Sequence, residues 1–254
     1  MDLSIVVPVY NEAGCLEDNL NRLVAYLDTL PATWEILVVD DGSMDATGHI
    51  CRQLVKTHKR VTLIAYAPNR GKGHAVQTGM LAAVGRFRIF MDADLAVPVE
   101  FIGLCHSLYT QGAEIVIGSR HLKDSVYKVP EGVLRTFLGK TYRRLTLDLF
   151  GLSISDITCG LKGFSAGATQ AVFSRAKVER WGYDAEILFI AEKLGYAIRE
   201  LPVYWYHSFD SNVRLGLDVP RTFYEMLLIW RNYRQGHYRL PAGKAGPGSG
   251  PCRS

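Results

Sequence analysis

The feature that most constrains the fold is the alternation, through the first half of the chain, of short apolar runs with longer segments of helical periodicity. The runs are rich in β-branched residues and nearly continuous in apolar residues, as in strands buried on both faces. Strands separated by helices in this way predict an α/β fold, a mostly parallel sheet with helices on both faces. The expected strands are 3–9, 34–40, 61–66, 86–92 and 113–119, and the expected helices are 14–29, 44–58, 71–84 and 98–111.

The second half is less regular. It contains two amphipathic segments, a loop, a helix, a strand and a tail rich in Gly, Pro and Ser, which we expect to be disordered. In chain order these are the amphipathic segment 133–152, the loop 153–164, the helix 181–195, the strand 197–206, the amphipathic helix 216–240 (clearest at 219–234) and the tail 241–254.

Composition sets the broad class. A chain of 254 residues, 48% of them hydrophobic, can bury a large core without disulfides or a structural metal. Its five cysteines are odd in number and form no CxxC pair, which favours reduced thiols in a cytoplasmic protein. The net charge of +4 is mild, and we expect no nucleic-acid partner. A strand begins at residue 3 and no apolar run approaches the roughly 18–20 residues of a membrane span, so we expect neither signal peptide nor transmembrane helix.

Acidic residues follow three of the expected strands. Glu12 follows the first, Asp41 ends the pair 40–41 after the second, and Asp92 and Asp94 follow the fourth. In parallel sheets ligands bind beyond the carboxyl ends of the strands. A helix cap explains a single acid such as Asp45. It does not explain Asp92 and Asp94, which share one face of an extended segment and can hold one cation. Carboxylates suit Mg²⁺ or Mn²⁺, and a structural acid pair is the alternative.

The segment "NRGKGHAVQTGM" places Lys72 between two glycines, just before helical periodicity begins. Helix N-termini attract phosphate groups. The segment lacks the spacing of a Walker A loop, and no GxGxxG follows the first strand, so a dinucleotide site is not indicated. Taken alone, it fits a turn with a solvated lysine as well as it fits a phosphate contact.

Together these motifs resemble those of family 2 glycosyltransferases. The segments "VVPVYNE", "VVDDGSMDAT", "NRGKGHAVQTGM", "MDADL" and "IGSR" occur in that family's order and spacing. The later segments "DITCGLKGF" and "RWGYDAEILFIAEKLGYAIRELPVYW" resemble the branch that glycosylates polyprenyl phosphates. The resemblance covers roughly residues 3–215. It implies the glycosyltransferase A-type Rossmann-like fold. The catalytic domain would span 1–215, with a nucleotide-sugar half at 1–120 and an acceptor half at 121–215.

The resemblance also implies the residues of a donor site. Asp92 and Asp94, with Ala93 between them, look like the family's DxD segment, which holds a divalent cation (Mg²⁺ or Mn²⁺) against the sugar diphosphate. Ala96 stands where mannosyl members often carry an additional glutamine ligand, which favours UDP-glucose over GDP-mannose as the donor. The remaining implied donor contacts are Pro8, Tyr10, Glu12 and Asp41 to the nucleoside, and Lys72.

On the acceptor side, a phosphate monoester is already a dianion near neutral pH, so it needs cations rather than a base. Arg120 and Arg135 match arginines that bind the lipid phosphate in this branch, and Arg214 can replace a lysine that the chain lacks at position 212. Asp184 matches an acceptor-side acid, which either orients groups or, with a hydroxyl acceptor, acts as the base.

The implied function is inverting, metal-dependent transfer of a hexose from a nucleotide sugar to a polyprenyl phosphate. The alternatives are transfer to a saccharide or other hydroxyl, mannosyl transfer from GDP-mannose, and a non-catalytic nucleotide-sugar-binding module. The segments 133–152 and 216–240 each combine an apolar face with basic residues, which favours peripheral contact with the cytosolic face of a membrane. The alternative is that these apolar faces pack inside the protein.

Overall fold

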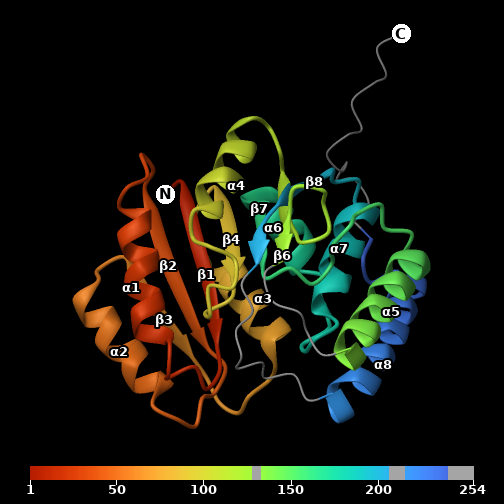
Figure 1. Ribbon diagram of the computed structural model, residues 1–254, viewed down its shortest axis with the longest axis horizontal. Coiled ribbons are helices and arrows are strands. Elements are labelled where there is room, and N and C mark those ends of the chain that lie inside the picture. Colours follow the sequence, from red (N-terminus) through yellow and green to blue (C-terminus); the bar gives the residue numbers. More distant parts are fainter. Residues whose placement is uncertain (128–132, 206–214, 240–254) are drawn as a thin grey trace.

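The computed structural model describes residues 1–127, 133–205 and 215–239, and for 127, 133–137 and 215–220 it describes the backbone alone. A seven-stranded sheet in the order β3-β2-β1-β4-β7-β5-β8 runs through the protein between two layers of helices (Figure 1). A two-stranded sheet pairs β6 with β9. The expected α/β class and mostly parallel sheet are confirmed.

The strands of the main sheet are β1 (Leu3–Val9), β2 (Trp34–Asp40), β3 (Val61–Ala65), β4 (Phe87–Met91), β5 (Ile115–Ser119), β7 (Leu161–Ser165) and β8 (Ile198–Pro202). The small sheet consists of β6 (Val126–Tyr127) and β9 (Tyr204–Trp205). The helices are α1 (Leu16–Leu27), α2 (Thr47–Thr57), α3 (Lys72–Ala82), α4 (Phe101–Thr110), α5 (Val133–Phe150), α6 (Ala166–Phe173), α7 (Tyr183–Lys193) and α8 (Leu215–Arg234).

Alternation along the strands builds two hydrophobic cores, one on each face of the sheet. In β1, Leu3, Ile5 and Val7 lie in the core formed with α1, α2 and α4. Val6 lies in the core formed with α3, α6 and α7. Because successive side chains of a strand point to opposite faces, an almost wholly apolar strand serves both cores. Strand β1 pairs in parallel with β2 and with β4, so their carboxyl ends meet at one edge of the sheet.

The expected loop 153–164 is wrong at its end, because strand β7 begins at Leu161. This strand lies antiparallel between β4 and β5, in the middle of the sheet. Its sequence, LKGFS, carries a lysine and a glycine among few apolar residues, and so it gives no strand pattern. The strand forms because Lys162, although fully buried, has polar partners. The later part of the chain therefore completes the sheet begun by the first part.

Helices α5 and α8 pack against each other, and Figure 1 shows them side by side at one end of the molecule. The apolar faces that we expected to be continuous are divided between the interior and the surface. In α5, Tyr142 packs on the core whereas Leu145 and Leu149 are exposed; in α8, Met226 is buried whereas Leu227 is exposed. Each helix therefore buries one side, as the packing alternative expects, and leaves apolar residues exposed on another, while membrane contact stays a prediction. Among the described residues, no helix has the length and apolar character that crossing a bilayer requires.

Candidate functional site

The acids predicted to gather at the carboxyl edge of the sheet do so. Glu12 lies in the turn after β1, Asp41 directly follows β2, and Asp92 and Asp94 follow β4. Because β1 lies between β2 and β4, these three turns are neighbours. Pro8 lies buried near the end of β1, and Tyr10 follows that strand, partly exposed. The parallel topology thus brings together residues that are up to 86 positions apart, from Pro8 to Asp94.

The DxD segment forms a tight turn. Asp94 accepts a hydrogen bond from the Ala96 N–H at 3.0 Å, and Leu95 has a φ of +51°, a region that leucine rarely adopts. Asn19 of α1 donates to the Ala93 carbonyl at 2.9 Å and holds the turn from outside. Strained backbone of this kind persists where the surroundings enforce it, commonly at functional sites. The sequence alone does not indicate Asn19, because it lies 74 positions before Ala93 and no local pattern connects the two residues.

Three carboxylates repel one another in this turn region. Burial, and then the negative charge of Asp94, raise the pKa of Glu12 to about 7. Burial, and then the charge of Asp92, raise the pKa of Asp94 above its ordinary value. Groups that resist ionisation because like charges surround them are suited to a bound cation. Among the described residues, no set of three or more His, Cys, Asp or Glu side chains could hold a metal by itself.

The raised pKa of Glu12 predicts a pH dependence of stability in the metal-free protein. The folded state keeps the Glu12 proton up to about pH 7, whereas the unfolded state releases it near 4.5. The contribution of Glu12 to stability is therefore greatest at low pH and is lost as the pH rises from 4.5 to 7. In chelator, Glu12→Gln should match the wild type in melting temperature at pH 5 and exceed it at pH 7.5. The exposed Glu17→Gln variant is the control, and equal behaviour of the two variants would contradict the prediction.

Lys72 lies between the acids. Its Nζ is 2.5 Å from Asp92 Oδ1, and it begins α3 with side-chain exposure of 24%. Burial lowers the pKa of the Lys72 ammonium, but the charges of Asp92 and Asp184 outweigh that effect and raise the pKa. Gly71, with a φ of +115°, adopts a backbone conformation that favours glycine. The reading of this segment as a turn with a solvated lysine is therefore wrong, because Lys72 is paired inside the acidic cluster.

Asp41 fixes the loop that carries Lys72. Its buried carboxylate accepts hydrogen bonds from Asn69 Nδ2 at 2.7 Å and from the backbone N–H groups of Arg70 and Gly71, each at 2.8 Å. A carboxylate that accepts three such bonds holds a loop in one conformation. In the structure, the Asp41 carboxylate therefore binds the loop of residues 69–71. The nucleoside contact that the family resemblance implies would be an additional role.

Gly160, in the segment before β7, is required by the position of Asp92. A Cβ atom at Gly160 would lie 2.3 Å from Asp92 Oδ2, closer than any real contact. We expect Gly160→Ala to displace this carboxylate and to lower kcat on the order of 10- to 100-fold, with a higher Mn²⁺ concentration needed for half-maximal rate. Gly167→Ala, at a helical position with open space around the Cβ, is the matched control. Equal rates for both variants would contradict the prediction.

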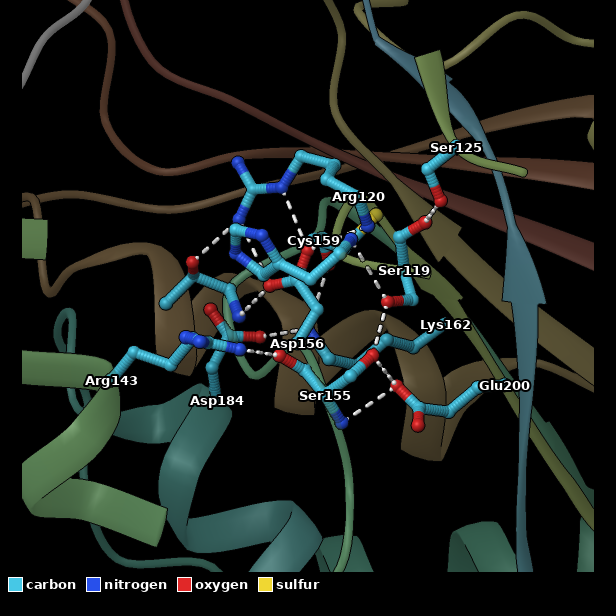
Figure 2. A network of polar contacts seen from close by, with 12 residues as sticks. Ser119, Arg120, Ser125, Arg143, Ser155, Asp156, Cys159, Lys162, Asp184 and Glu200 are labelled. Carbon is cyan, nitrogen blue, oxygen red and sulfur yellow. Dashed lines mark hydrogen bonds and ion pairs between the residues drawn. The ribbon is translucent and has the colours of Figure 1, made fainter. Parts of the chain in front are cut away.

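Arg120 lies across the sheet edge at the end of β5, in a dense polar network (Figure 2). Its Nε and Nη2 donate to the two oxygens of Asp156 at 2.8 and 3.0 Å, and Nη2 also donates to Thr158. Burial opposes ionisation of Asp156, but the Arg120 guanidinium lowers the pKa of this acid to about 2. Arg120 is thus held in a fixed orientation by a buried acid that sequence reasoning did not single out.

Lys162 and Asp184 form a buried ion pair in the same region, also drawn in Figure 2. Lys162 Nζ lies 2.5 Å from Asp184 Oδ1 and donates to the Cys159 carbonyl at 2.7 Å. Burial raises the pKa of Asp184, although the charges of Lys162 and Lys72 oppose the rise. The sequence pointed to Asp184 but not to Lys162, because a lysine in a loop-like segment is ordinarily solvated.

Three further arginines bear on the acceptor side, namely Arg143, Arg135 and Arg214. Arg143 of α5 donates to the Ser155 carbonyl and is partly buried (Figure 2). Arg135 belongs to α5, but its side chain lies outside the described part of the protein. Arg214 and the tail 241–254 lie outside the described residues altogether. The structure therefore brings Arg120 to the site and leaves the other two expected arginines as predictions.

Two of the hollows in the described part of the protein are candidate sites. A small one adjoins the DxD turn and is lined by Met91, Asp92, Ala96, Val97, Gly160 and Trp205. A wider one of about 480 Å³ lies between α2 and the edge strand β3, with Arg52, Lys56 and Leu63 in its lining. The wider hollow has no acid in its lining and lies away from the strand-end cluster. We therefore place the candidate site at the small hollow and the carboxyl edge, where the charged groups converge.

Comparison with known proteins gives consistent matches. The family model described as Glycosyl transferase family 2 matches residues 4–173. A dolichyl-phosphate beta-glucosyltransferase of Dictyostelium discoideum is 31% identical over 90% of this chain and 76% of its own length. The Drosophila melanogaster protein of that name is 33% identical over 94% of this chain and 78% of its own length. A Mycobacterium tuberculosis glucosyl-3-phosphoglycerate synthase, solved with Mn²⁺, UDP and product, superposes with a TM-score of 0.65 at 17% identity, over 95% of this chain and 81% of that one.

Proposed function

This chain belongs to glycosyl transferase family 2, and from that premise we propose that it transfers glucose from UDP-glucose to a dolichyl or other polyprenyl phosphate at a membrane surface. The observation that carries the proposal is the convergence of Glu12, Asp92 and Asp94 with Lys72 at the carboxyl edge of the sheet. The diphosphate of a nucleotide sugar is negatively charged, so its binding at the carboxyl edge of the sheet requires cations there. The relatives described above carry names that match this activity.

The acidic cluster fits a divalent metal. Asp92 and Asp94 supply two carboxylates, and Asp92 Oδ1 has no hydrogen-bond partner beyond its ion pair with Lys72. Mg²⁺ and Mn²⁺ commonly bind through one or two carboxylates together with substrate phosphates, which a pair of carboxylates such as Asp92 and Asp94 can supply. We propose Asp92 and Asp94 as the metal residues, with Mn²⁺ or Mg²⁺ as the ion. When bound, the cation would offset charge on the departing diphosphate.

The remaining donor contacts follow the strand ends. We propose that the nucleoside subsite is lined by Pro8, Tyr10, Glu12 and Asp41. Ala93 lies between the two metal residues. Lys72, whose ammonium is held near Asp92, would then exchange that partner for a donor phosphate. An ammonium is a compact point charge on a flexible stem, so this exchange requires rotation of one side chain and no backbone movement.

The acceptor side favours a phosphate over a hydroxyl nucleophile. A phosphate dianion needs orientation by cations and no general base. Asp184, the acid available to act as a base, is buried and ion-paired to Lys162, which suits an orienting role better than proton transfer. We propose Arg120, Arg135 and Arg214 as phosphate contacts within an acceptor half formed by 121–215. Inversion at the sugar carbon then follows from direct attack by the acceptor oxygen.

Helices α5 and α8 are the proposed contact with anionic lipid on the cytosolic face of a membrane. Among their described side chains, the large exposed apolar ones are Leu145, Leu149, Tyr224, Leu227, Trp230 and Tyr233. Arg144 on α5 and Arg231 and Arg234 on α8 are exposed among them. Apolar side chains interspersed with arginines fit the boundary of headgroups and acyl chains, where each basic residue adds about 1 kcal/mol.

The deciding experiment is a transfer assay with detergent-solubilised enzyme. Labelled UDP-glucose or GDP-mannose is offered with polyprenyl phosphate or with free sugars as acceptors, in Mn²⁺ or Mg²⁺. We expect glucose on polyprenyl phosphate, with a β linkage by NMR, and little transfer from GDP-mannose. Transfer to hydroxyl acceptors alone would contradict the proposal and would assign Asp184 as a base. Binding of UDP-glucose without any turnover would indicate a non-catalytic module.

A further inference from the structure

Residues 177–182, the last six of the stretch that joins α6 to α7, form a segment that we call the connecting segment. It is anchored at both ends by buried carboxylates. Glu186 of α7, fully buried, accepts hydrogen bonds from the backbone N–H groups of Lys177 and Val178. Glu225 of α8, 6% exposed, accepts one from the Gly182 N–H at 2.7 Å. Glu186 lies in the same helix turn as the acceptor-side acid Asp184, yet its carboxylate accepts backbone hydrogen bonds.

The connecting segment forms the wall behind the loop of Lys72. A Cβ atom at Gly71 would lie 2.6 Å from the Glu179 carbonyl, and one at Gly73 would lie 2.7 Å from the Val178 carbonyl. The backbone N–H of the residue after Gly73 donates to the Glu179 carbonyl at 2.9 Å. The two segments are therefore in direct backbone contact on both sides of Lys72. A shift of the connecting segment must move Lys72 or break this contact.

The contact between Glu225 and Gly182 is equally close. A Cβ atom at Gly182 would lie 2.8 Å from Glu225 Cβ, so α8 meets the start of α7 where a glycine leaves room for it. Gly182 immediately precedes α7, and Asp184 lies in the first turn of that helix. Position 225 thus faces the site, whereas Tyr224 and Leu227 on the same helix face outward and are more than half exposed.

We propose that Glu225 is a positioning residue that couples α8 to the donor site. Its carboxylate fixes the connecting segment, and through that segment it fixes Lys72 and Asp184. Placement of α8 on a lipid surface then increases turnover, because it holds Glu225, and the site behind it, in one arrangement. This inference rests on the proposed function, which supplies the lipid contact and the reaction.

The test compares Glu225→Leu with Glu225→Gln. The two side chains are similar in size, but only glutamine retains an oxygen that can accept the Gly182 N–H. A short, water-soluble polyprenyl phosphate is the acceptor, so that reaching the substrate does not require lipid. We expect Glu225→Gln to stay within about twofold of the wild-type kcat and Glu225→Leu to lose about tenfold, since a buried donor is left unpaired. The KM for the acceptor should change little, and Glu17→Leu, at an exposed acid of α1, is the control.

Vesicles of phosphatidylcholine and phosphatidylserine supply the second part of the test. Wild type should gain in kcat when vesicles are added, and Glu225→Leu should sediment with vesicles but gain little. A wild-type kcat and lipid response in a folded Glu225→Leu variant would overturn the proposal.

Hydrogen exchange of the wild type gives a readout that needs no variant. Vesicles should slow exchange at the Gly182 amide and through the connecting segment. Unchanged exchange in vesicle-bound protein, or no binding to vesicles, would overturn the coupling. Absence of glucosyl transfer to polyprenyl phosphate would instead contradict the proposed function, while the exchange result would still stand by itself.

Discussion

Replacing Asp94 by alanine is expected to lower kcat for sugar transfer by about 10³-fold, the loss typical when one electrostatic stabiliser of developing charge is removed. Asp94 is one of the two carboxylates that follow β4, and the other, Asp92, is ion-paired with the Lys72 ammonium, so the variant leaves a single, partly neutralised carboxylate for the cation. Thermal stabilisation by UDP-glucose with Mn²⁺ should be lost in the same variant, because ligands stabilise only the state that binds them.

The unliganded Asp94→Ala protein should melt close to the wild type. The variant loses the hydrogen bond from the Ala96 N–H, but it also loses the repulsion between Asp94 and Glu12, which after burial contributes most to the raised pKa of Glu12. Unfolding and loss of function can therefore be told apart. Asp124→Ala, at an exposed acid, is the control. Full turnover in Asp94→Ala, or in wild type treated thoroughly with chelator, would contradict the metal assignment.

Replacing Lys162 by methionine is expected to give the largest loss of stability. The ammonium is fully buried, and its removal leaves the buried Asp184 without its ion-pair partner. Breaking a buried ion pair at one partner costs about 3–5 kcal/mol, which for a chain of this size lowers the melting temperature by roughly 10 °C. The measurement is denaturant unfolding at neutral pH, together with a thermal melt.

Two further variants test the reason for that loss. Arg144→Met removes an ion pair with Asp148 whose side chains are 79% and 58% exposed, and it should cost less than about 1 kcal/mol. The double variant Lys162→Met with Asp184→Leu replaces the buried pair by apolar groups and should recover much of the lost stability. If Lys162→Met were as stable as Arg144→Met, the ion pair between Lys162 and Asp184 would have no structural role.

The state of Asp184 bears on the type of acceptor. An acid that must accept a proton from a hydroxyl needs an unengaged oxygen and access to the substrate. In this protein Asp184 is buried, and one of its oxygens is bound by Lys162. A phosphate acceptor makes no such demand, so the arrangement agrees with transfer to a polyprenyl phosphate.

The sequence by itself determined the strands in the first half of the chain and the position of the acids. Alternation of apolar strands with helices is a local pattern, and it located the first five strands to within two residues at each end. Because parallel strands share one carboxyl edge, the order of the motifs was sufficient to place Glu12, Asp41, Asp92 and Asp94 together. These inferences succeeded because each depends on residues that are close in the chain or on a topology with few alternatives.

Only the tertiary structure decided which charged residues are buried and what they contact. Strand β7 depends on pairing with β4 and β5, between residues 45 to 78 positions apart. The partners Lys162 and Asp156 and the anchoring role of Glu225 depend on contacts between residues 22 to 43 positions apart. A lysine or a glutamate has the same local pattern whether it is solvated or paired in the interior. Its environment is set by elements that are distant in the sequence and close in the fold. The local periodicity of the sequence contains no information about those contacts.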